Sequence, residues 1–258
     1  MITDRFPPAY DGKRLCAENR KDKIMIFDIT LALCKGFGIT LLLFVLTLVF
    51  ALPLGLGISF CTMSKNKIVS GISKCFVWII RGVPLMLFIF IIYYLPGLLG
   101  SSKNVFNDLD IFFTLNAGQS KLLWYGRFLA VLIAFVINYA CYFSEIYRGG
   151  IESISQGQYE AGQVLGLTKS QIFGKIILKQ VIKRIVPPMS NEIITLIKDT
   201  ALANAIAIPE IILCAKNMAA ESALVWPLFY TAVFYLLFVG LLTILLRRLE
   251  GRLSYFKG

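Results

Sequence analysis

The chain has 258 residues, of which 57% are apolar and 16% charged, and its mean hydropathy is +0.74. Soluble domains carry close to a quarter charged residues, so this composition excludes a soluble globular protein and indicates an integral membrane protein. The net charge is +11, but the basic residues are spread along the loops, which argues against a nucleic-acid interface. The chain has no histidine and its six cysteines show no regular spacing, so neither a metal site nor a disulfide framework is predicted.

The first part of the chain divides into a polar arm and an apolar segment. The first 23 residues lack the continuous apolar core of a signal peptide, so we expect the N-terminal arm, residues 1–35, to be retained beside a membrane domain at 36–258. The sequence assigns the arm no role. Gly36–Cys61 then gives twenty-six residues without a charge, against the roughly 20 that a helix needs to cross a bilayer. The stretch 53–57, with one proline and two glycines, is expected to interrupt this helix.

Further apolar segments predict an all-α integral membrane protein with about five transmembrane helices, because helices satisfy their own backbone hydrogen bonds in lipid. These segments are Gly82–Ser102, Phe128–Ser144, a weaker one from about Ile185 to Ile212, and Ala223–Leu246. Pro84 is predicted in the first helical turn of the second segment, where its missing N–H costs no hydrogen bond. The side that holds residues 148–185 carries fourteen Lys and Arg, against twelve opposite when Arg127 at a segment edge is counted. The positive-inside rule therefore places the C-terminus in the cytoplasm and the N-terminus outside.

Several charged residues lie within or beside the apolar segments. Arg81 stands at the cytoplasmic start of the second segment, where it either extends toward lipid headgroups or takes part in function. Glu145 and Arg148 are three residues apart, so they share a helix face and are expected to neutralise each other. Lys198 and Asp199 are adjacent opposite charges within the weaker segment. Either these two pair structurally or they line a path for a charged solute.

A large polar loop at 148–185 separates the third and fourth segments, and we predict a short helix, a glycine turn and a second helix. Gly166 is placed where the first helix should stop, since glycine enters the left-handed conformation without steric cost. Two patterns fit capping boxes that start the two helices: Ser155 with Gln158, and Thr168 with Gln171.

The second helix of this loop is predicted to be amphipathic. Its apolar row is Phe173, Ile177, Val181 and Ile185, and its cationic row is Lys175, Lys179 and Lys183. Periodicity alone fits a helix that rests on anionic lipid headgroups. The glycines of the first helix, Gly157 and Gly162, each lower helix propensity by roughly 1 kcal/mol and instead suggest close approach to a partner surface.

Five motifs follow one another from Gly36 onward. They are Gly36 to Thr40-Leu41, Arg81-Gly-Val-Pro84, Tyr142-Phe-Ser-Glu145-Ile-Tyr-Arg148-Gly-Gly-Ile151-Glu-Ser-Ile, Gly157-Gln-Tyr-Glu160-Ala-Gly-Gln-Val-Leu-Gly166-Leu, and Lys198-Asp-Thr-Ala-Leu202. In this combination the chain resembles the permease subunits of bacterial ATP-binding-cassette (ABC) importers, and more specifically those of polar amino acid uptake systems. The fourth motif resembles the EAA loop of that family.

The resemblance implies a multi-pass permease of the bacterial cytoplasmic membrane that moves a polar amino acid by alternating access. It implies no enzyme and no cofactor on this chain, because ATP and Mg would be bound by partner ABC ATPase subunits. The other implied partners are a second permease subunit (identical or related), an extracytoplasmic solute-binding protein and membrane lipid. Contact with the ATPase maps onto Gln158, Tyr159, Glu160, Ala161, Gly162 and Gly166. The residues assigned to a translocation path or gate are Arg81, Pro84, Glu145, Arg148, Lys198 and Asp199.

Three positions depart from the family pattern. Gly162 replaces the second alanine of the EAA signature, which suggests a looser coupling helix. Lys179 stands where proline is usual, so the second loop helix is expected to continue uninterrupted, and Ala201 replaces a serine.

The alternative function is an ion-coupled secondary transporter or channel that uses Lys198, Asp199 and Glu210 as its charged path. The large capped loop and the lack of a repeated half argue against it. An intramembrane enzyme is disfavoured, since the chain lacks histidine, paired catalytic carboxylates and a nucleophile with a nearby base.

Overall fold

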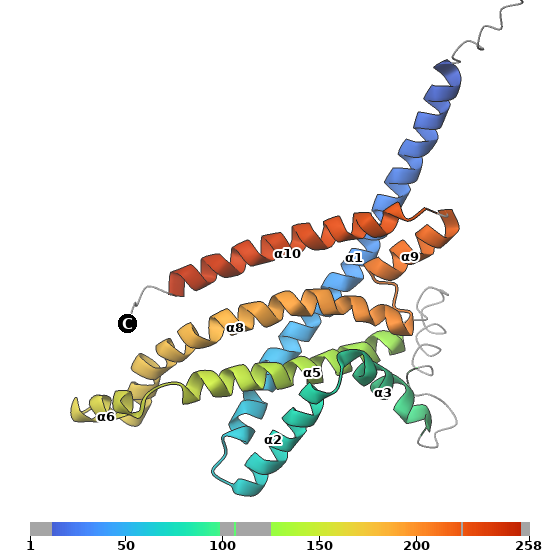
Figure 1. Cartoon of the computed structure of the whole chain (residues 1–258). Coiled ribbons are helices and arrows are strands. Elements are labelled where there is room, and N and C mark those ends of the chain that lie inside the picture. Colours follow the sequence, from blue (N-terminus) through green and yellow to red (C-terminus); the bar gives the residue numbers. More distant parts are fainter. Residues whose placement is uncertain (1–11, 99–105, 107–124, 223, 254–258) are drawn as a thin grey trace, which may run out of the picture.

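The computed structural model describes residues 12–98, 106, 125–222 and 224–253, and the secondary structure of this part of the chain is entirely helical (Figure 1). The long helices are α1 (Gly12–Thr62), α2 (Lys67–Gly82), α3 (Leu85–Leu98), α5 (Tyr125–Glu152), α8 (Leu178–Asp199), α9 (Ile211–Ser222) and α10 (Trp226–Leu253). Shorter elements are α6 (Gln156–Val164), α7 (Lys169–Gln171), the π-helix η2 (Ile172–Ile177) and the 3₁₀-helix η3 (Thr200–Ile206).

Length and composition select membrane-crossing helices among these elements. Ile29–Thr62, Gly126–Glu152 and Trp226–Leu253 qualify, and the bent pair α2–α3 makes a fourth if it is one span. The prediction of an all-α membrane protein is therefore confirmed, and the described residues hold three or four such helices.

Helix α1 passes through residues 53–57 without a break, so the predicted interruption is wrong. Pro53 lies inside the helix, which membrane helices tolerate because neighbouring groups satisfy the freed carbonyl. Gly55 serves packing instead. A Cβ at this position would lie 2.8 Å from the carbonyl oxygen of Ala140, so the glycine lets α1 and α5 approach closely. The same helix also runs across residues 35 and 36, where the arm was expected to end.

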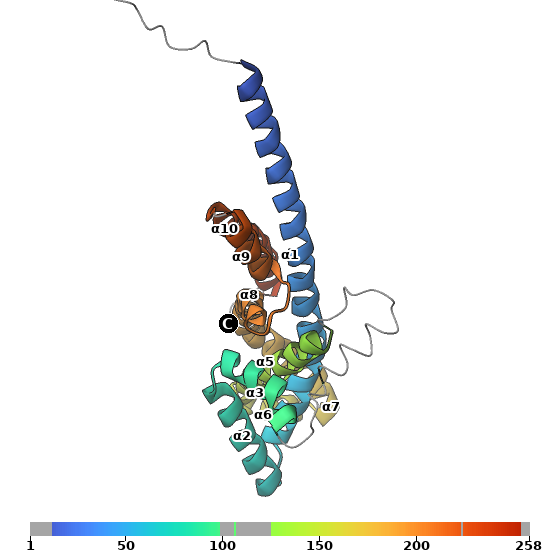
Figure 2. The ribbon, with the colours of Figure 1, turned by 90° about the vertical axis from the view of Figure 1, so that its right-hand side faces the viewer.

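The core is organised around α5. In the most apolar 18-residue stretch of α5, 56% of the residues are buried. The corresponding share in α10, which lies at the edge of the bundle, is 6% (Figures 1 and 2). Phe135, Tyr139 and Phe143 follow one another at helical spacing and are almost fully buried. Helices α1, α2, α3 and α8 pack against α5, so residues on α5 are held on several sides.

The predicted second segment is divided in the structure. Helices α2 and α3 meet at an angle of 106°, with Val83 and Pro84 between them. The proline ring disfavours a helical conformation at the residue before it, and Val83 is indeed extended, with φ −93° and ψ 130°. Pro84 was expected in the first helical turn but lies one position earlier. Its carbonyl accepts the first helical hydrogen bond, from the N–H of Phe88 at 3.1 Å.

The loop at 148–185 has the predicted order of helix, glycine turn and helix. Gly166 has φ +71°, as expected for a left-handed stop, and the Thr168–Gln171 capping box is complete, with bonds of 3.0 and 3.4 Å. Ser155 is the N-cap residue of α6, but its side chain makes no capping hydrogen bond, so the other predicted box does not form.

The second loop helix begins as α7, becomes η2 and continues as α8 to Asp199. Its expected end at Ile185 is therefore wrong, and the helix passes through Pro187 and Pro188 into the fourth apolar segment. The predicted apolar row is buried at Ile177 and Val181, whereas Phe173 is 44% exposed. The helix forms a small separate core with α6 and the end of α5, at Ile154, Ile172, Ile177 and Val181.

Candidate functional site

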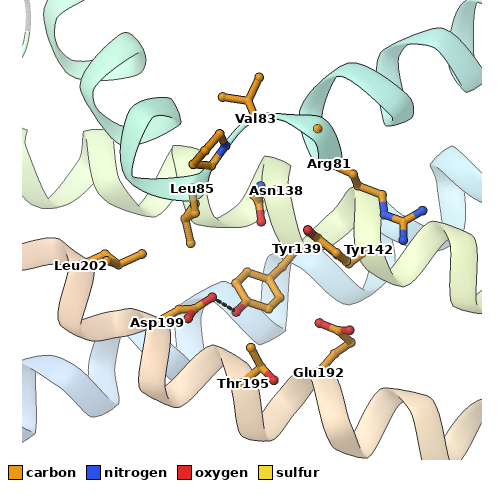
Figure 3. A pocket seen from close by; sticks show the side chains of 12 residues that line it. Arg81, Val83, Leu85, Asn138, Tyr139, Tyr142, Glu192, Thr195, Asp199 and Leu202 are labelled. Atoms are coloured by element: carbon orange, nitrogen blue, oxygen red, sulfur yellow. Dashed lines mark hydrogen bonds between the residues drawn. The ribbon is translucent and has the colours of Figure 1, made fainter.

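A polar cavity of about 580 Å³ lies beneath the α2–α3 bend (Figure 3). Its walls come from the bend, from α5 and from α8 with the start of η3. The lining residues are Arg81, Gly82, Val83, Pro84, Leu85, Asn138, Tyr139, Tyr142, Glu192, Thr195, Asp199 and Leu202. Both charge signs and several hydroxyl or amide groups therefore face one space between apolar helices.

Helical spacing explains why these side chains converge. Glu192, Thr195 and Asp199 are separated by three and four residues, so they share one face of α8. Asn138 and Tyr142 are four residues apart on α5 and face them (Figure 3). The arrangement thus follows from two helix faces and one bend, with no loop needed to build the site.

Two contacts hold Arg81 and Asp199, two of the three charged residues that line this cavity. The hydroxyl of Tyr139 donates a hydrogen bond of 2.7 Å to Asp199 (Figure 3). The guanidinium of Arg81 lies over the ring of Tyr142, 4.9 Å from the centroid, in cation–π geometry. A tyrosine of α5 therefore contacts one charged group from the bend and another from α8.

A second cavity of about 450 Å³ adjoins the first and extends toward the 148–185 loop. The two cavities share Arg81, Tyr142 and Glu192. The rest of the second cavity is lined by Glu145, Ile146, Gly149, Gly150, Ser153, Arg184 and Pro188. The shared residues therefore lie at the junction of the two cavities.

An ion cluster borders this junction at the end of α5. Arg148 forms ion pairs of 2.6 Å with both Glu145 and Glu152, which confirms that Glu145 and Arg148 share a face and neutralise each other. Arg81 Nη1 lies 3.9 Å from Glu145 Oε2, so α2 is linked to the same cluster. Arg81 thus contacts protein groups, although 41% of its side chain is exposed.

The structure brings together some of the predicted path residues and separates others. Arg81, Pro84 and Asp199 line the first cavity and Glu145 lines the second. Lys198 is exposed and lines neither, and within the described residues it forms no ion pair with Asp199. Of the two alternatives for that dipeptide, structural pairing is therefore wrong, and only the aspartate reaches the cavity.

Glu210, part of the alternative ion path, serves a different purpose. It is fully buried and accepts hydrogen bonds from the N–H groups of Ile212 and Leu213 at 2.9 and 2.8 Å. These bonds cap the start of α9. Glu210 lines neither of the two cavities.

Sequence reasoning missed most of the polar lining, namely Asn138, Tyr139, Tyr142, Glu192 and Thr195. One signal was available, since Glu192 is an acidic residue seven positions from Asp199 in an apolar segment, a spacing that places both on one helix face. The α5 residues carried no comparable signal, because tyrosine and asparagine are common in ordinary helices.

The predicted coupling residues lie at the far end of α5 from the α2–α3 bend, on and just after α6 (Figure 1). Glu160 and Ala161 are exposed and Tyr159 is half-buried. The side-chain oxygen of Gln158 accepts a 3.2 Å hydrogen bond from Gln180. Gly162 is buried and packs closely against Ile172. This close packing does not fit the expectation that Gly162 loosens the helix.

Membrane helices that enclose a polar cavity, with a helical loop projecting beyond them, are the architecture of a membrane transport component. Residues 51–255 match the family described as binding-protein-dependent transport system inner membrane component, and the chain belongs to this family. It is a multi-pass protein of the inner membrane and a permease subunit, and nucleotide is bound and hydrolysed by a separate subunit.

Curated relatives are similar over most of their length. The arginine ABC transporter permease protein ArtQ of Escherichia coli K12 is 30% identical over 235 residues, covering 87% of this chain and 96% of that protein. The glutamine transport system permease protein GlnP of the same strain is 31% identical, with coverage of 86% and 93%. The L-cystine transport system permease protein TcyB of Bacillus subtilis 168 is 33% identical, with coverage of 74% and 72%.

A solved structure has the same fold. A chain in the crystal structure of an amino acid ABC transporter with histidines superposes with a TM-score of 0.72 at 25% identity, covering 89% of this chain and 97% of that chain. A chain of the MetNI methionine ABC transporter in an inward-facing conformation has a TM-score of 0.57 at 15% identity, which shows likeness of fold alone.

Proposed function

We propose that this permease subunit moves a polar amino acid into the bacterial cytoplasm by alternating access, and that the cavity beneath the α2–α3 bend is its solute site. The observation that carries the proposal is the presence of both charge signs in one cavity, with Arg81 on one side and Glu192 and Asp199 on the other. A free amino acid carries a carboxylate and an ammonium group, and these complement the two signs. The relatives named for arginine, glutamine and cystine support this solute class.

The chemistry assigns a role to each wall. The Arg81 guanidinium matches a carboxylate, since its planar donors pair with two oxygens. Glu192 and Asp199 match the solute's ammonium group, and Asn138 and Thr195 supply neutral hydrogen-bonding groups for its side chain. Lys198 does not line this cavity, and its only proposed link to the path is that it is adjacent to Asp199.

The junction of the two cavities is the proposed gate. Arg81, Tyr142 and Glu192 belong to both cavities, and Arg81 is also linked to the ion cluster of Glu145 and Arg148. A displacement of the end of α5 would move this cluster and with it Arg81. The gate and the 148–185 loop are thus mechanically connected through one helix.

The remaining architecture is proposed from the family. It consists of a membrane domain at 36–258 with five transmembrane helices, a cytoplasmic coupling loop at 148–185 between the third and fourth, a cytoplasmic C-terminus and an external N-terminus. The partners are ABC ATPase subunits that contact α6, a second permease subunit, and an extracytoplasmic solute-binding protein. The exposure of Glu160 and Ala161 on α6 supports this ATPase contact.

The test is uptake of radiolabelled amino acids into proteoliposomes that contain the permease with its co-purified ATPase and binding protein. We expect ATP-dependent uptake of one or a few polar amino acids that survives collapse of the ion gradients, with Glu192→Gln and Asp199→Asn each reducing it at least tenfold. Glu221→Gln is the matched control, because it removes a carboxylate that is exposed on α9. Uptake that disappears with the ion gradient although ATP is present would overturn the proposal.

A further inference from the structure

A third cavity, of about 470 Å³, lies between α8 and α10 and belongs to neither the solute site nor the coupling helix. It is lined by Lys183, Val186, Pro187, Arg247, Glu250, Gly251 and Leu253. We propose that this cavity binds the phosphate-bearing headgroup of an anionic phospholipid, with phosphatidylglycerol as the class of ligand that fits its groups.

The charges of the cavity come from two different helices. Lys183 lies on α8 and Arg247 on α10, and within the described residues neither forms an ion pair. Two cations that converge from separate elements suit a single phosphate, which accepts charge-assisted hydrogen bonds from both. Basic pockets between membrane helices on the cytoplasmic side are a recognised form of lipid headgroup site.

Glu250 narrows the choice of headgroup. Its carboxylate lines the same cavity and accepts hydrogen bonds but donates none. A headgroup with free hydroxyls next to its phosphate satisfies the carboxylate, whereas a choline headgroup has no hydroxyl to donate. The combination of two cations and one acceptor therefore fits the glycerol phosphate of phosphatidylglycerol.

The position of the cavity favours a lipid over free phosphate. It lies at the last turns of α10, which is long and apolar enough to cross the membrane. Only 6% of the most apolar 18-residue stretch of α10 is buried within the protein. Leu253 and Val186 add apolar surface to the cavity. Ile244, three residues before Arg247 and on the same helix face, is 51% exposed and continues this surface toward the bilayer. Acyl chains would lie along that face while the headgroup occupies the cavity.

The test is native mass spectrometry of the purified chain in mild detergent, titrated with phosphatidylglycerol, phosphatidylcholine or inorganic phosphate. We expect phosphatidylglycerol adducts that persist under mild activation and at least tenfold weaker retention in the double variant Lys183→Gln/Arg247→Gln. The control is Lys179→Gln/Arg248→Gln, which removes the same two charges from exposed positions on the same helices that do not line the cavity. In a further titration with phosphatidic acid, whose headgroup has no alcohol hydroxyl, Glu250→Gln should weaken binding less than it weakens binding of phosphatidylglycerol.

The same measurement distinguishes phosphatidylglycerol from a soluble anion and from a second copy of the chain. Equal loss of adducts in the two double variants would overturn the site, since charge alone would then explain binding. Inorganic phosphate that binds as well as phosphatidylglycerol would make the ligand a soluble anion. A change in the number of chains per complex without a change in lipid adducts would make the occupant a second copy of the chain. Thermal unfolding of all variants in the same detergent identifies any that are misfolded, and Glu250→Gln supplies the test if the double variant is one of them.

Discussion

The hydroxyl of Tyr139 donates a hydrogen bond of 2.7 Å to the carboxylate of Asp199, and this bond joins the middle of α5 to the last residue of α8. The two residues are 60 positions apart in sequence. Tyr139 is almost fully buried, so its hydroxyl needs a partner inside the protein. The bond therefore holds α8 against the central helix and fixes the carboxylate at the cavity wall.

Replacing Tyr139 by phenylalanine should affect both stability and transport. A hydrogen bond to a charged group contributes about 1.5–3 kcal/mol, so Tyr139→Phe should lower the unfolding temperature in detergent and reduce amino acid uptake several-fold. Tyr142→Phe is the control, since it removes a hydroxyl from the same wall but keeps the ring beneath Arg81. An equal response of the two variants would show that the Asp199 bond has no special role.

Arg81 should matter for transport much more than for stability. Its pairing with Glu145 is long, at 3.9 Å, and partly exposed, and such pairs contribute about 0–1 kcal/mol. Arg81→Gln should therefore unfold at nearly the wild-type temperature but reduce ATP-dependent uptake at least tenfold. Arg81→Lys, which keeps the charge but loses the planar donor group, should recover part of the activity. Uptake by Arg81→Gln at the wild-type rate would exclude Arg81 from the path.

Replacing Gly162 by alanine tests why this chain lacks the alanine that is usual at this position. A Cβ on Gly162 would lie 2.7 Å from Cγ1 of Ile172, a distance that requires Ile172 to move. Gly162→Ala should cost about 1–3 kcal/mol by overpacking, despite the better helix propensity of alanine. In an Ile172→Ala background the same change should be neutral or stabilising. This double-mutant cycle is measured by thermal unfolding, and additive effects would contradict the proposed contact.

Replacing Gly166 by a residue with a bulky side chain should disturb the turn, because such residues disfavour its left-handed backbone conformation. Its φ is +71°, and L-residues pay about 1–2 kcal/mol to adopt this conformation. Gly166→Val should weaken coupling between ATP hydrolysis and uptake by displacing α6. Gly174→Ala on η2 is the matched control, because a Cβ there also meets no atom within 4 Å and the residue has no positive φ. Tightly coupled transport by Gly166→Val would mean that this turn does not set the position of α6.

Glu160 is the residue of α6 on which the ATPase contact can be tested directly. Glu160→Lys reverses an exposed charge on this helix and should abolish co-purification of the ATPase while the permease still inserts into the membrane. Glu221→Lys makes the same charge change on α9 and should leave co-purification intact. Normal recovery of the ATPase with the Glu160 variant would refute the assignment of α6 as the coupling helix.

The features that sequence analysis predicted are those set by neighbouring residues. The Thr168–Gln171 box, the turn at Gly166 and the Glu145–Arg148 pair each depend on residues two to four positions apart, so spacing and side-chain chemistry determine them. The family motifs added the transport function but no geometry.

The features that were missed depend on packing between distant segments. The residues next to Tyr139 in sequence do not indicate that Asp199 will lie beside it. Gly55 suggests a helix break in the sequence, and only its close contact with α5 explains why a glycine is needed there. The bend at Pro84 had a local cause, but its angle of 106° is set by how α2 and α3 each pack on α5.

The bend between α2 and α3 also exposes two backbone ends at the cavity. Residues 81–85, which include the last residues of α2 and the first of α3, line its wall. The last carbonyls and the first N–H groups of a helix have no partner within it, so the end of α2 carries partial negative charge and the start of α3 carries partial positive charge. The bend would thus offer the proposed zwitterionic solute two opposite partial charges that cannot titrate, so this part of its recognition would persist at any pH at which the fold survives.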